Sequence, residues 1–75
     1  MDRLRQKYVC ENGDIWEIWM VEYDTDKYFK GGRDIVTQFK KNGYEQGHIT
    51  EHYDGAGVMR QKNIHGIVSI PDGCK

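Results

Sequence analysis

The sequence predicts an α+β domain: a small, mostly antiparallel β-sheet with one short helix. Three observations predict it: an Asn12-Gly13 dipeptide of the kind that closes β-hairpins, aromatic and β-branched residues over 15–23, and helical spacing over 33–42. The predicted order is strand, strand, strand, helix, strand, strand, strand. One helix on one sheet makes two layers, so residues 1–75 are expected to form a single domain.

The first two predicted strands, 7–11 and 14–23, form a hairpin around Asn12-Gly13. That dipeptide suits a type I′ turn, because both of its residues adopt positive φ readily. In the resulting register Val9 lies opposite Trp16. The 15–23 run also has helical apolar spacing, but its β-branched and aromatic content favours a strand.

A short third strand is predicted at 27–30, and Gly31-Gly32 then separates it from the helix at 33–42. Apolar residues at positions i, i+1 and i+4 make one face of this helix. An acidic residue lies in its first turn and two lysines lie in its last. This charge order matches the helix dipole. Asn42-Gly43 supplies a helix stop.

The second half of the chain is predicted to return to strands. These are expected at 47–53, 58–62 and 66–70, with a flexible turn between the first two. The tail at 71–75 follows the single proline and is expected to fray.

The two cysteines, Cys10 and Cys74, are predicted to be free thiols, because a signal peptide is not visible at the start of the sequence. The alternative is one disulfide that ties the C-terminal tail to the first strand and requires an oxidising compartment.

Composition excludes several classes of protein. Eleven Lys and Arg against twelve Asp and Glu give a net charge of −1, which provides no global field toward nucleic acid or an anionic membrane. No apolar run approaches the ~18 residues of a membrane span. The sequence therefore predicts a cytoplasmic protein.

Both faces of the long strand are largely apolar, and one helix covers only one of them. The sheet could curl over the other face, or a second copy of the chain or a partner could dock there. We expect Trp16, Ile18 and Met20 to be the exposed set, flanked by Arg5 and Lys7, as a partner-binding patch. The alternative is a strand buried inside one domain.

One motif has the letters of a metal site. His48, Glu51 and His52 make an H-x-x-E-H pattern that resembles the zinc motif of the inverzincin peptidases, which would make the histidines ligands and the glutamate a base. On a strand the two histidines lie ~13 Å apart, too far to chelate one ion. A structural zinc site remains an alternative, with five candidate ligands: His48, His52, His65, Cys10 and Cys74.

An anion or a nucleic-acid phosphate could bind at the start of the predicted helix, at Lys30, Gly31, Gly32 and Arg33. The alternative is that the glycines only provide the turn. No nucleophile with an identifiable base partner is apparent, so neither a catalytic site nor a cofactor is predicted.

The leading functional prediction is a protein-binding module, a regulator or inhibitor that occupies a partner surface. Compact chains without catalytic motifs are typical of such proteins, including phage proteins that act on host machinery. The second hypothesis is a sheet-based nucleic-acid binder that uses Arg5, Lys7, Lys30 and Arg33. The third is a zinc-binding domain or a metal-dependent enzyme.

Overall fold

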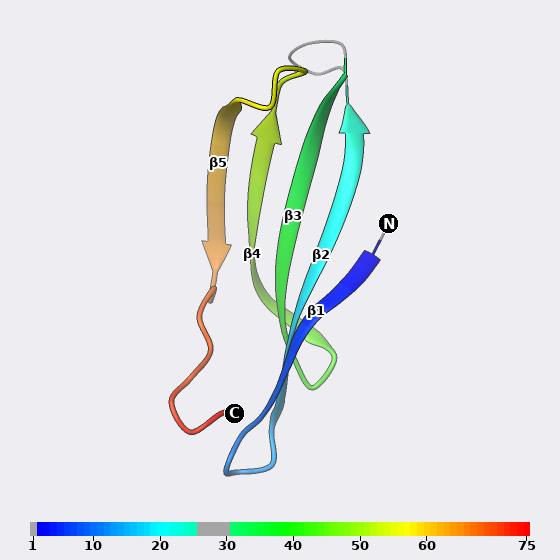
Figure 1. Ribbon diagram of the computed structural model, residues 1–75. Coiled ribbons are helices and arrows are strands. Elements are labelled where there is room, and N and C mark those ends of the chain that lie inside the picture. Colours follow the sequence, from blue (N-terminus) through cyan, green and yellow to red (C-terminus); the bar gives the residue numbers. More distant parts are fainter. Residues whose placement is uncertain (1, 26–30) are drawn as a thin grey trace.

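The computed structural model describes residues 2–25 and 31–75, and its strands form one antiparallel sheet (Figure 1). Its five strands lie side by side in chain order: β1 (Asp2–Val9), β2 (Ile15–Thr25), β3 (Gly32–Lys41), β4 (Tyr44–Tyr53) and β5 (Met59–Gly66). These described residues contain no helix, so the predicted α+β class is wrong and this part of the protein is all-β. It follows that none of them forms a helix suited to crossing a membrane.

The segment predicted to be a helix, 33–42, is strand β3 and the turn that follows it. Along β3, Ile35, Thr37 and Phe39 alternate with Val36 and Gln38 in the ladders to both neighbouring strands. β-branched and aromatic residues favour this pleated arrangement. A helix of ten residues is marginal in water, whereas β3 gains hydrogen-bonded partners on both sides from β2 and β4.

Asn42-Gly43 is a hairpin turn and not the predicted helix stop. Both residues have positive φ, 52° and 88°, and they connect the directly opposed residues Lys41 and Tyr44. This is the two-residue connection that type I′ turns provide. Strand β4 consequently begins three residues earlier than the predicted strand at 47–53.

The first hairpin has a three-residue loop in place of the predicted two-residue turn. The Cys10 N–H donates to the Asp14 carbonyl at 2.8 Å, and the Gly13 N–H donates to the Cys10 carbonyl at 3.0 Å. A type I turn followed by a glycine with positive φ makes such a loop. The register therefore moves by one residue and places Tyr8 opposite Trp16, so the predicted faces of β1 are exchanged near the turn.

The predicted strands at 58–62 and 66–70 are replaced by β5 alone, which includes the residues expected to separate them. The chain leaves the sheet after Gly66, and 67–75 folds without becoming a strand of it. The predicted strand at 27–30 lies outside the described residues.

One face of the sheet is called here the Trp16 face and the other the Trp19 face. Val21 is buried on the Trp19 face, and the main buried cluster lies on the Trp16 face. That cluster consists of Cys10, Trp16 and Phe39. Partly buried residues of the sheet and of the C-terminal segment 67–75 pack against them: Tyr8, Ile18, Ile49, Val68, Ile70 and Cys74. The C-terminal segment thus covers apolar residues of the sheet, as the predicted helix was expected to do.

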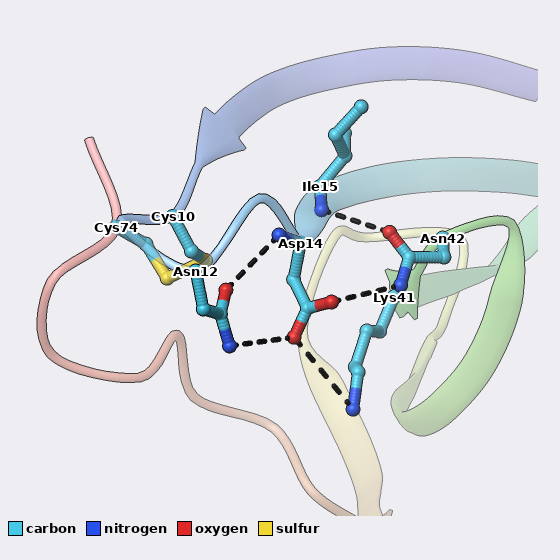
Figure 2. The surroundings of a disulfide bond; sticks show 7 residues. All are labelled: Cys10, Asn12, Asp14, Ile15, Lys41, Asn42 and Cys74. Atoms are coloured by element: carbon cyan, nitrogen blue, oxygen red, sulfur yellow. Dashed lines mark hydrogen bonds and ion pairs between the residues drawn. A yellow bond between two sulfur atoms is a disulfide. The ribbon is translucent and has the colours of Figure 1, made fainter.

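Cys10 and Cys74 form a disulfide (Figure 2), so the prediction of free thiols is wrong and the disulfide alternative is confirmed. The tail is also bonded through its backbone. Val9 and Lys75 exchange N–H to carbonyl bonds of 2.9 and 3.1 Å, and the Glu11 N–H donates to the Gly73 carbonyl at 2.9 Å. Residues 71–75 are therefore attached to the end of β1.

Candidate functional site

The predicted partner-binding residues of β2 lie on the face that forms the core. Trp16 is only 4% exposed, Ile18 packs against the buried cluster, and Met20 is half-buried. The expectation that these three side chains form the exposed set is thus wrong for Trp16, because the C-terminal segment packs on this face. A role in partner binding remains untested for all three.

The two predicted flanking cations are exposed but do not share the side of Trp16. Lys7 lies opposite Glu17, and alternation places it on the Trp19 face. Arg5 is the extra residue of a β-bulge between Leu4 and Gln6. The structure therefore does not join them to Trp16 in one patch.

The predicted anion site does not lie at the start of a helix, because the segment that includes Gly32 and Arg33 is strand β3. Gly32 is the buried first residue of β3 and Gly31 is exposed just before it, so no helix N-terminus is formed by the described part of this segment. The Arg33 Nη1 lies 2.8 Å from the Glu22 Oε1, which compensates its charge. Lys30 lies outside the described residues.

The H-x-x-E-H residues lie on strand β4, as the sequence analysis predicted. The buried His52 has its Nδ1 2.6 Å from the Asp34 Oδ1, whereas His48 has its Nδ1 3.2 Å from the Glu45 Oε2. The His48 and His65 rings are 5.3 Å apart. Nowhere in 2–25 or 31–75 do three or more His, Cys, Asp or Glu side chains form a group that could hold a metal.

The most accessible regular element is strand β5 at the edge of the sheet (Figure 1). All eight of its residues are exposed, and among the described strands only β4 pairs with it. Its exposed residues include Met59 and Ile64, which are 47% and 61% exposed. An edge of this kind is a template for pairing with another chain.

The backbone of β5 directs hydrogen-bonding groups outward at defined residues. In an antiparallel ladder, successive residues bond alternately to one neighbour and to the other side. Because the Ile67 N–H donates to the Gln46 carbonyl at 3.0 Å, the continuous register assigns Gln61, Asn63 and His65 to bonding with β4. Lys62 and Ile64 then present their N–H and carbonyl groups to the outer side.

The loop before β5 is held by a buried carboxylate. Asp54 is 8% exposed, and its Oδ1 accepts the N–H groups of Ala56 at 2.9 Å and Val58 at 3.0 Å. Its Oδ2 lies 3.6 Å from the Arg60 Nη1. These bonds fix the β-bulge at Arg60, after which residues 61–66 pair with β4 in unbroken register.

The opposite edge, β1, is covered at its C-terminal end, whereas no described strand pairs with the outer side of β5. The outward N–H groups of Val9 and Glu11 already donate to the C-terminal tail, and a bulge interrupts β1 at Arg5. Bulges and covering segments are common means of protecting a sheet edge. The outer side of β5 therefore offers an unpaired edge to a second chain.

The sequence does not indicate this edge, and residues 63–65 were expected to connect two strands. The eight residues of β5 show no apolar alternation, and Ile64 is the only β-branched residue among them. No family model, no curated protein and no solved structure matches the chain.

Proposed function

We propose that this protein is a protein-binding domain that adds an extended segment of a partner protein to its sheet at β5. The observation that carries the proposal is the outward direction of the Lys62 and Ile64 backbone groups at an exposed edge. Strand addition is a recurring mode of peptide recognition in which main-chain hydrogen bonds provide affinity.

The size of this edge favours a regulatory interaction over a permanent one. Lys62 and Ile64 each offer one donor and one acceptor, and a hydrogen bond contributes about 0.5–1.5 kcal/mol net. A short added strand also buries little surface, as weak or transient interfaces do. These arguments support a regulator or inhibitor that occupies a segment of its partner.

A proline substitution tests this function. A display library of short linear peptides would be selected against wild type, and the binders measured against Ile64→Pro and Ile64→Thr. Proline is tolerated on edge strands where its nitrogen faces outward, but it removes an outward donor. We expect Ile64→Pro to lose binding and Ile64→Thr, which keeps the N–H, to retain most of it.

Equal binding by all three proteins would contradict strand addition at β5. Circular dichroism and thermal unfolding of each variant distinguish a lost site from a lost fold. If Ile64→Pro does not fold, methylation of the Ile64 amide nitrogen by chemical synthesis removes the same donor.

The disulfide also supports a proposal on the cellular compartment in which the protein acts. Disulfides form and persist in oxidising compartments and are rare in the cytosol, so the Cys10–Cys74 bond favours an oxidising location over the predicted cytoplasmic one. We therefore place the proposed binding function in an oxidising compartment. Titration of free thiols in protein taken from its native source, with and without denaturant, tests this part of the proposal.

A further inference from the structure

We propose that the β5 edge selects an antiparallel partner segment in which an apolar residue is followed two positions later by an acidic one. This inference rests on the proposed function and specifies its partner. Three features of the outer edge determine the pattern: an exposed cation that makes no direct ion pair among the described residues, an exposed isoleucine beside the core, and the direction of the ladder.

The cation is Lys62. Strand β5 contains Arg60 and Lys62 but no acidic residue, and Arg60 is already close to the Asp54 carboxylate. Lys62 is exposed, and within 2–25 and 31–75 it has no ion pair shorter than 4 Å. Its cross-strand neighbour Glu51 accepts a hydrogen bond from the Tyr53 hydroxyl at 3.2 Å. Glu51 faces Lys62 from the β4 side without a direct ion pair, so a carboxylate on an added strand would face the exposed Lys62 ammonium from the other side.

The apolar feature is Ile64, which is 61% exposed. It lies directly opposite Ile49, a partly buried residue that packs against the core cluster. An apolar side chain on the added strand, opposite Ile64, would extend this row by one residue. Such cross-strand pairs are the main source of side-chain stabilisation between strands.

Strand direction converts these two contacts into a sequence pattern. Lys62 and Ile64 are two residues apart, so both side chains point to the Trp16 face. In an antiparallel partner, the residue opposite Lys62 comes two positions after the residue opposite Ile64. The pattern is therefore apolar, any residue, acidic, with the middle side chain on the Trp19 face beside Asn63.

A second copy of the chain does not supply this pattern at its own edge. When β5 pairs with β5 of another copy, no carboxylate of that strand can meet Lys62, because Met59–Gly66 contains none. Self-association through this edge is thus disfavoured relative to an acidic segment. Light scattering across a concentration series is the corresponding check, and a stable dimer lost in Ile64→Pro would overturn the assignment of the partner.

Three capped peptides test the pattern by titration into isotope-labelled protein, with the amide resonances of Lys62 and Ile64 as the readout. The matching peptide is Thr-Thr-Val-Thr-Glu-Thr, the charge control is Thr-Thr-Val-Thr-Lys-Thr, and the order control is Thr-Glu-Thr-Val-Thr-Thr. We expect the matching peptide to bind about two- to fivefold more tightly than either control, the range of a favourable cross-strand charge pair.

A charge-reversal variant makes the test specific. Lys62→Glu should invert the preference, so that the lysine peptide binds more tightly than the glutamate peptide. Ile64→Pro should weaken all three. If wild type binds the three peptides equally and Ile64→Pro binds none, the pattern is wrong and strand addition stands. If Ile64→Pro binds them as wild type does, both proposals fall.

Discussion

Cys10 and Cys74, 64 positions apart in the chain, are joined in a disulfide that attaches the C-terminal segment to the end of β1. Cys10 belongs to the buried cluster with Trp16 and Phe39, and Val68 and Ile70 of the same segment pack against that cluster. The cross-link therefore holds in place the only described segment outside the sheet that contributes to the core.

Loss of this cross-link is expected to remove most of the stability of the fold. Closing a loop of 64 residues restricts the unfolded chain by about 4 kcal/mol in the chain-entropy model, and cores of this size rarely supply more than ~3–5 kcal/mol. Urea unfolding of oxidised and reduced protein measures the difference. The Cys10→Ser/Cys74→Ser variant is the control, because reductant should not change its midpoint.

Acidification is expected to weaken the first hairpin through Asp14. The Asn42 amide donates to its Oδ1 at 3.1 Å, the Asn12 amide donates to its Oδ2 at 3.1 Å, and the Lys41 Nζ lies 3.9 Å away (Figure 2). The Asn42 bond is the largest cause that lowers the pKa of Asp14 below its usual value, with Asn12 and Lys41 adding to it against the opposing effect of desolvation.

A lowered pKa in the folded state stabilises the fold above the unfolded pKa, and this contribution is lost as pH falls through the folded pKa. The window runs from about pH 5 downward. Asp14→Asn lacks the charge, so its stability should fall less than that of wild type over this window. Parallel losses in urea midpoint for the two proteins would contradict the role of Asp14.

Gly47 is expected to tolerate no side chain. A Cβ there would lie 2.3 Å from the Ile67 carbonyl oxygen and 2.5 Å from its nitrogen, where the chain leaves the sheet. Because these are backbone atoms, the C-terminal segment would have to shift, and we expect Gly47→Ala to cost more than about 2 kcal/mol. Gly57→Ala is the control, with positive φ but nothing within 4 Å of its Cβ, and should cost about 1–2 kcal/mol.

The sequence predicted that residues on both sides of Asn12-Gly13 pair, but not their register. Glu11 joins Asn12 and Gly13 in a three-residue loop, and that one residue exchanges the faces of β1 between the turn and the bulge at Arg5. The same dipeptide at 42–43 forms the true two-residue turn, which the sequence analysis interpreted as the end of a helix. Local residue preferences are compatible with a helix end and with a hairpin turn at 42–43. Pairing of β3 with its two neighbouring strands selects the turn.

The candidate site at the β5 edge could not be predicted from the sequence, for a different reason. Whether β5 lies at an edge depends on the order of all five strands in the sheet. The residues of one strand do not determine that order. The disulfide is similar, since pairing of residues 64 positions apart depends on where the C-terminal segment returns. The burial of Trp16 likewise depends on the C-terminal segment, whose Val68 and Ile70 pack against its cluster.

Trp16→Ala now distinguishes a core role from a binding role. Because Trp16 is 4% exposed, truncation should cost about 3–5 kcal/mol and leave little folded protein at room temperature. The matched control is Trp19→Ala on the opposite face, where Trp19 is half-buried and Lys40 lies 5.0 Å over its ring; it should cost less than half as much. Circular dichroism with urea unfolding measures both variants, and a folded Trp16→Ala of nearly wild-type stability would restore the interpretation of Trp16 as a surface anchor.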